Sequence, residues 1–139
     1  ISPEKKDSDF TWKDFQNRNN NELVDIYANF INRVIVLTNK YYDGIIPKIS
    51  DLQSIDKDIL KEIEKSIELV GHYIEKFEFK KSLMSFMNIA RIGNKYLTDT
   101  EPWKLIKNDE TRVRTIMNIS INVVAALSII SEPFFEYPL

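Results

Sequence analysis

The sequence contains no cysteine, which excludes disulfides, thiolate nucleophiles and metal sites built from cysteine. Its single histidine, His72, has no second histidine or cysteine with which to hold a zinc ion. The three glycines are scattered, so they cannot form the glycine-rich loop that cradles phosphates. We therefore expect no catalytic residue, no metal site and no bound cofactor in this chain.

Long apolar runs are also lacking. The longest, residues 116–130, contains two asparagines and two serines, whereas a transmembrane helix needs about 20 mainly apolar residues. The first six residues lead into charged sequence rather than into the apolar core of a signal peptide. We expect no membrane partner. Because the chain does not begin with methionine, we expect it to be part of a longer protein.

What the sequence does contain is typical of one soluble helical domain. Of its 139 residues, 43% are hydrophobic and 29% are charged, with a net charge of −2. Few glycines and prolines leave few tight turns, which favours long helices over many short strands. The pattern predicts an all-α bundle of about five helices. The apolar periodicity places them near 12–17, 20–42, 54–76, 78–96 and 109–131.

Within and just after the helix predicted over residues 78–96, a glycine and a proline are expected to affect packing and backbone conformation. Gly93 is expected to permit the close approach of a neighbouring helix. Residues 98–103 are predicted to form a loop that ends at Pro102 and Trp103. Because proline fixes its own φ and restricts the residue before it, Glu101 is expected to be extended and the Trp103 backbone to be well constrained.

Asn29 and Arg33 are one helical turn apart and share one face of the segment 20–42. The apolar residues of this segment are predicted to form an arc on the opposite side: Val24, Tyr27, Ala28, Ile31, Val34, Ile35 and Tyr42. An outward Asn/Arg pair, together with an accessible Trp103, can read and stack an unpaired base.

The order and spacing of several stretches resemble the anticodon-binding domain of the methionyl-tRNA synthetases, a family of class I enzymes. The stretches that carry the resemblance are FTWKDF (10–15), RNNNEL (18–23), ANFINR (28–33), IGNKY (92–96), EPWKL (101–105) and the helix over 109–133. The similarity extends over nearly all of residues 10–135, and no single motif carries it alone.

The resemblance implies a lead-in segment with a short helix over residues 1–19 and an α-helical anticodon-binding domain over residues 20–139. It also implies that Asn29, Arg33 and Trp103 bind the anticodon of methionine tRNA, chiefly its first base, cytosine. The longer enzyme would be cytoplasmic and would ligate methionine to its tRNA with ATP and magnesium. Its partners would be the anticodon loop of methionine tRNA and the catalytic domain of the same chain, with no DNA. Without that domain, we expect this chain to be inactive.

Two alternatives remain at this stage. One is the related domain of another class I synthetase, such as the valine or isoleucine enzyme. The other is a helical protein-interaction module, which predicts a buried Trp103 and an Asn29/Arg33 pair on a different surface. Asn94 is expected to be a satisfied buried amide. Five cations are candidates for phosphate contacts: Lys95, Lys104, Lys107, Arg112 and Arg114.

Overall fold

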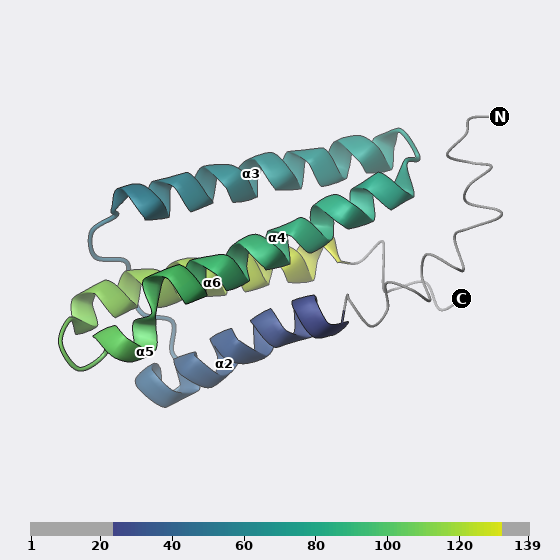
Figure 1. Ribbon diagram of the computed structural model, residues 1–139. Helices are drawn as coiled ribbons and strands as arrows, with labels where there is room; N and C mark the ends of the chain where they lie inside the picture. Colours follow the sequence, from purple (N-terminus) through teal and green to yellow (C-terminus); the bar gives the residue numbers. More distant parts are fainter. Residues whose placement is uncertain (1–23, 132–139) are drawn as a thin grey trace.

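The computed structural model describes residues 24–131, and every regular element in that range is helical. In chain order the elements are the π-helical turn η1 (Val24–Ala28) and the helices α2 (Asn29–Tyr42), α3 (Ser54–Glu75), α4 (Phe79–Thr100), α5 (Pro102–Leu105) and α6 (Glu110–Ile130). Figure 1 shows α3 and α4 as an antiparallel pair, with α6 behind α4 and α2 along the lower side. The prediction of an all-α bundle is confirmed for the described residues.

Helix α6 lies at the centre of the bundle and packs against α2, α3, α4 and α5. Its inward side chains are almost fully buried and form much of the core: Val113, Ile116, Met117, Ile119, Val123 and Leu127. Among the described helices, α6 alone is long and apolar enough to cross a membrane, yet 44% of its most apolar window is buried inside the bundle. Its place in the core therefore accounts for its composition.

The predicted ends of the long helices are mostly correct. The end of α2 and both ends of α3 and α6 agree with the prediction to within one residue. The predicted helix at 12–17 and the predicted start at residue 20 lie outside the described residues.

The prediction of a loop over residues 98–103 is wrong. Helix α4 continues to Thr100, and α5 begins at Pro102. Between them Glu101 is left-handed, with φ 48° and ψ 60°, rather than extended as predicted. Proline disfavours a right-handed helical conformation in the residue before it. The N–H of Glu101 donates to the carbonyl of Leu97 at 3.0 Å, which caps α4.

The buried face of α2 is displaced from the predicted arc. Its centre is Phe30, which is fully buried, whereas Ala28 and Ile35 are exposed. The reason is the gap that Gly93, which has no side chain, leaves on α4. The Phe30 ring fills this gap, since a Cβ atom on Gly93 would lie 2.5 Å from Cζ of the ring. The expected close approach at Gly93 is thus confirmed. Because Phe30 occupies this gap, Arg33 lies at the edge of the buried face rather than opposite it.

One buried network ties α3, α4 and α6 together. Arg112 donates from Nη1 to Oδ2 of Asp56 at 2.6 Å and from Nη2 to Oδ1 at 2.8 Å. The hydroxyl of Tyr96 donates to Oδ1 at 2.6 Å, and the backbone N–H of Gln53 donates to Oδ2 at 2.8 Å. Asp56 has no exposed surface. These bonds fix the last turns of α4, which lead directly into α5.

Replacing Asp56 by asparagine is expected to lower the free energy of unfolding by about 3–5 kcal/mol, because Arg112 would stay buried with an unpaired charge. Burial alone raises the pKa of Asp56, but the bonds from Arg112, Tyr96 and Gln53 outweigh it and hold that pKa below its usual value. The unfolded state therefore binds a proton more readily than the folded state. The contribution of the network is full above the ordinary aspartate pKa of about 4, and it is lost as the pH falls further.

Urea unfolding of the wild type and of Asp56→Asn, at about pH 7 and at about pH 3, measures this dependence. The difference between the two proteins should shrink at the lower pH. An equal difference at both pH values would contradict the assigned ionisation of Asp56.

Candidate nucleic-acid interface

Trp103 lies in α5, a single helical turn between α4 and α6. Pro102 is buried and occupies the first position of that turn, where its missing N–H leaves no partner unsatisfied. The N–H groups of Lys104 and Ile106 close the turn by donating to the carbonyls of Glu101 and Pro102, each at 3.0 Å. The indole remains 39% exposed. Its backbone is therefore fixed while its ring stays accessible to a ligand.

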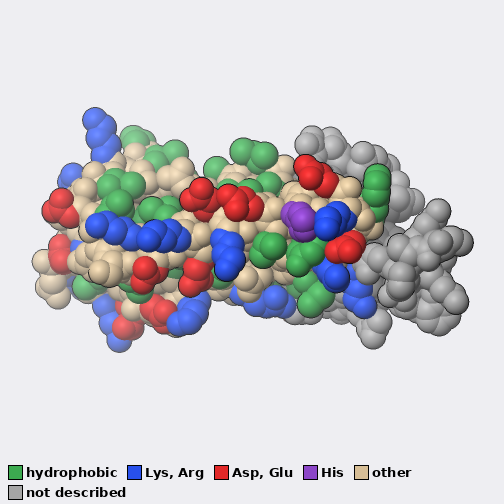
Figure 2. Space-filling view, turned by 90° about the horizontal axis from the view of Figure 1, so that it is seen from above, with side chains coloured by type: hydrophobic (Ala, Val, Ile, Leu, Met, Phe, Trp, Pro, Cys, Tyr) green, Lys and Arg blue, Asp and Glu red, His purple; other side chains and the backbone are tan. Residues whose placement is uncertain are grey.

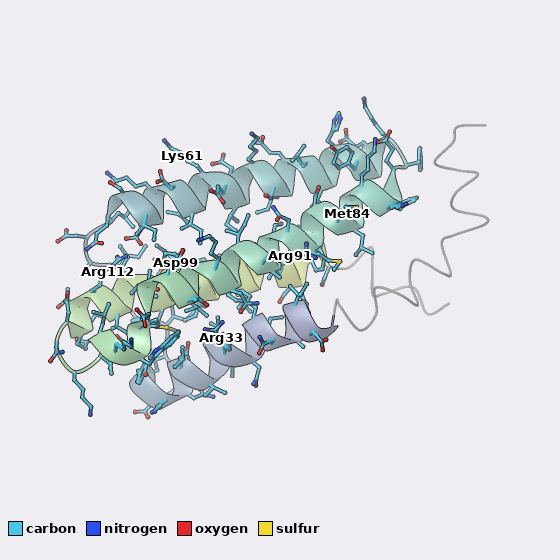
Figure 3. The ribbon with its side chains drawn as sticks, viewed as in Figure 1. Arg33, Lys61, Met84, Arg91, Asp99 and Arg112 are labelled. Atoms are coloured by element: carbon cyan, nitrogen blue, oxygen red, sulfur yellow. The ribbon has the colours of Figure 1, made fainter. Side chains whose placement is uncertain are left out.

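The structure brings Arg33 and Trp103 together although they are far apart in the sequence. The guanidinium carbon of Arg33 lies 5.6 Å from the centroid of the indole, within the range of a cation–π contact. Its Nη1 donates to Oδ1 of Asn94 at 3.1 Å. Figure 3 shows Arg33 between α2 and α4. Arg33 forms no ion pair with any residue in the range 24–131, so its charge is not neutralised there.

Asn29 is the first residue of α2 and lies one turn before Arg33 on the same side of the helix. Its side chain is exposed, and its amide makes no hydrogen bond with another described residue. Of the three residues singled out in the sequence, two are therefore in contact and the third is adjacent to Arg33. Asn29 retains both donor and acceptor groups for a ligand.

Asn94 is a satisfied amide, as expected, but it is half-buried rather than fully buried. Its Oδ1 accepts the bond from Arg33, and its Nδ2 donates to the carbonyl of Ile26 at 3.3 Å. Ile26 lies in the π-helical turn η1, an irregular start to the helix that carries Arg33. Sequence reasoning missed Arg33 as the partner of this amide. The only signal was an asparagine on the apolar side of α4, where an amide needs polar partners.

Most of the other candidate cations are already paired. Arg112 is excluded as a phosphate contact because it is buried against Asp56. Three exposed ion pairs join residues three or four apart in the sequence: Lys95 with Asp99, Lys104 with Glu101, and Arg114 with Glu110. Figure 2, seen from above in the direction of α3, shows positive and negative side chains interspersed. Because most of these cations are paired, the candidate interface is a local one, centred on Arg33 and Trp103.

A groove between α3 and α4, with a volume of about 240 Å³, is a poor alternative as a binding site for a nucleic acid. Its apolar side chains include Ile55, Ile59 and Ile92. Its rim carries three carboxylates and one cation: Asp58, Glu62, Asp99 and Lys95. A mainly acidic rim repels phosphates.

Two regions of the chain match known protein families. Residues 1–35, which include Arg33, match the family described as tRNA synthetases class I (M). Residues 46–137, which include Asn94 and Trp103, match the anticodon binding domain of methionyl tRNA ligase over more than half of the chain. The chain belongs to this family of methionyl-tRNA ligase anticodon-binding domains.

Several curated relatives are methionine–tRNA ligases. That of Christiangramia forsetii is 55% identical over 136 residues, which make up 98% of this chain and 20% of the ligase. That of Phocaeicola vulgatus is 54% identical with the same coverage. That of Flavobacterium johnsoniae is 51% identical over 98% of this chain and 19% of the ligase. The chain therefore spans about a fifth of the length of these relatives.

Solved structures share the fold. The free state of the Mycobacterium tuberculosis methionyl-tRNA synthetase superposes with a TM-score of 0.76 at 22% identity. Its complex with methionyl-adenylate superposes with a TM-score of 0.77 at 23% identity. Each match covers 84% of this chain and 24% of the other. Both support the all-α fold described above.

The contact between Phe30 and Gly93 can be tested with a matched pair of glycine substitutions. Gly93→Ala is expected to lower the free energy of unfolding by about 1–3 kcal/mol, because its Cβ would displace the Phe30 ring. Gly71→Ala, on the exposed side of α3 with no atom near the added Cβ, should raise it by roughly 0.5–1 kcal/mol. Urea unfolding measures both. Stabilisation by both substitutions would show that Phe30 does not need the space above Gly93.

Proposed function

We propose that this chain binds the anticodon of methionine tRNA and reads chiefly its first base, cytosine, through Asn29, Arg33 and Trp103. The observation that carries the proposal is the Arg33 guanidinium 5.6 Å from the centroid of the partly exposed Trp103 ring. An aromatic face can stack on a base of any kind, and a charged donor group beside it can read the edge of that base. Membership of the family supports the same function.

Arg33 would supply the discrimination between cytosine and uracil. Arginine carries only hydrogen-bond donors, and cytosine offers acceptors at O2 and N3. Uracil carries an N–H at position 3, so a donor of Arg33 would meet another donor. Such an unmatched contact costs about 1–3 kcal/mol when it is shielded from water.

Trp103 would supply much of the affinity for the splayed base. Stacking of one base on an aromatic side chain contributes roughly 1–3 kcal/mol. Because buried Pro102 fixes the backbone of this turn, little ordering is required when the base binds. Asn29, which can donate and accept, is suited to orient the base or the guanidinium of Arg33.

We infer that the chain is the anticodon-reading part of a longer cytoplasmic enzyme that ligates methionine to its tRNA with ATP and magnesium. The support is that its curated relatives are methionine–tRNA ligases and that one solved structural neighbour is a complex with methionyl-adenylate. The catalytic domain of the same polypeptide would be the second partner of this chain. The chemistry of ATP and methionine is assigned to that domain and not to residues 24–131.

The two alternatives are less well supported. A domain of the valine or isoleucine type would not explain the match to the methionyl family. A protein-interaction module predicts a buried Trp103 away from Arg33, but the indole is partly exposed and in contact with that residue. Stem-loops with valine and isoleucine anticodons are therefore included as competitors in the test below.

The proposal predicts a loss of binding in two variants. Arg33→Ala and Trp103→Ala should each weaken binding of the methionine anticodon stem-loop by about 1–3 kcal/mol. Titrations of the 139-residue chain at one fixed salt concentration measure the affinities for stem-loops that differ only at the first anticodon base. The wild type should prefer cytosine, and Arg33→Ala should lose most of this preference.

Two controls separate base recognition from general effects. Lys61→Ala removes an exposed cation from α3, away from Arg33 (Figure 3), and should leave binding unchanged. Trp103→Phe keeps an aromatic face and should retain part of the affinity. If Arg33→Ala and Trp103→Ala both bind as tightly as the wild type, the site is wrongly assigned. If valine or isoleucine anticodons bind as tightly as the methionine anticodon, the substrate is wrongly assigned.

A further inference from the structure

We propose that Asn94 is a positioning residue that sets the orientation of Arg33 and thereby the preference for the first anticodon base. This inference rests on the proposed function and deepens it. Asn94 would not contact the base. It would determine which donors of the guanidinium face the base that stacks on Trp103.

The first argument is that the amide of Asn94 can be placed in only one way. Its Oδ1 accepts from Nη1 of Arg33 at 3.1 Å, while its Nδ2 donates to the carbonyl of Ile26 at 3.3 Å. Turning the amide over would bring a donor against Arg33 and an acceptor against the carbonyl of Ile26. Both partners therefore select the same orientation of the amide plane.

The second argument is that both partners of the amide belong to one continuous helical stretch. Ile26 lies in η1, and Arg33 lies about two turns later in α2. Asn94 projects from α4, next to Gly93, where Phe30 of the same stretch fits against the helix. The amide thus bridges two points on either side of this close contact. Its bonds fix the rotation of α2 relative to α4, and with it the direction from which Arg33 approaches Trp103.

The third argument concerns charge. A carboxylate at this position would also orient the guanidinium, but it would neutralise the cation that is needed near RNA. The neutral amide holds Nη1 and leaves the positive charge unpaired among the described residues. The indole lies against a second side of the group, with the guanidinium carbon 5.6 Å from its centroid. The remaining donors are therefore directed by two neutral contacts.

The consequence is a separation between affinity and discrimination. Without Asn94, Arg33 keeps its charge and its attraction to RNA, but its guanidinium can rotate about its own side chain. A rotating group can present donors to uracil O2 and O4 as well as to cytosine, so the distinction between the two bases weakens. Loss of Arg33 itself removes the donors and the charge together.

The experiment compares the wild type, Asn94→Ala, Arg33→Ala and the double variant. It measures their binding to stem-loops whose anticodon begins with cytosine or with uracil. For Asn94→Ala, the ratio of the two affinities should fall about tenfold, while the affinity for the uracil stem-loop changes less than about twofold. In the Arg33→Ala background, Asn94→Ala should change the ratio less than about twofold, because its effect acts through Arg33.

The ratio of affinities is a suitable measure because a smaller fraction of folded protein lowers both affinities equally and cancels. Asn88→Ala, an exposed asparagine on the same helix, is the matched control and should leave the ratio unchanged. A ratio in Asn94→Ala equal to that of the wild type overturns the inference. A further fall of the ratio in the double variant, as large as the fall in the single variant, also overturns it, because Asn94 would then act without Arg33.

The result also distinguishes this inference from the proposed function. If the wild type does not prefer cytosine over uracil, the proposed function fails. If the wild type prefers cytosine, Arg33→Ala loses the preference and Asn94→Ala keeps it, the proposed function stands and only the role of Asn94 is rejected.

Discussion

The buried carboxylate of Asp56 is the group on which the geometry of the bundle depends. It accepts hydrogen bonds from Arg112 of α6, Tyr96 of α4 and the N–H of Gln53 at the start of α3. A buried ion pair is not by itself strongly stabilising, but the loss of one partner leaves the other as an uncompensated buried charge. Any arrangement that separates Asp56 from Arg112 is therefore unfavourable, and the three helices are held in one arrangement. Tyr96 is one turn from the end of α4, which continues into the turn that carries Trp103. The position of the indole is thus linked to a polar contact in the core.

A second contact in the core determines where Arg33, the other half of the candidate interface, lies. Phe30 fills the space above Gly93, and this contact brings η1 and α2 close to α4. Arg33 and Asn94 lie on the two helices beside this contact, at hydrogen-bonding distance from each other. A polar pair at the edge of a tightly packed aromatic contact has little freedom to rearrange. The candidate interface therefore combines side chains whose positions depend on two separate contacts in the core.

The sequence predicted the fold well, because the long helices have clear apolar periodicity and clear ends. It predicted the end of α4 poorly, because Pro102 disfavours a right-handed helical conformation at Glu101 but does not determine whether that residue is extended or left-handed. The buried face of α2 was misplaced because the space above Gly93, rather than the average hydrophobicity of the arc, determines which side turns inward. Arg112 illustrates the same limit, since a cation on a helix is usually exposed unless a distant carboxylate is buried beside it. Helical spacing grouped Asn29 with Arg33, the family resemblance assigned them and Trp103 to the anticodon, and their role in binding remains a proposal.

The contact between Arg33 and Trp103 also bears on how such chains are divided into units. The two residues fall into regions matched by different families, with Arg33 within residues 1–35 and Trp103 within residues 46–137. A cut between these regions would retain the indole and Asn94 but remove the guanidinium, and it would also uncover the surface of α4 on which Phe30 packs. The boundary between the two matched regions therefore passes through the middle of the candidate interface, and the smallest unit that keeps both Arg33 and Trp103 must include α2.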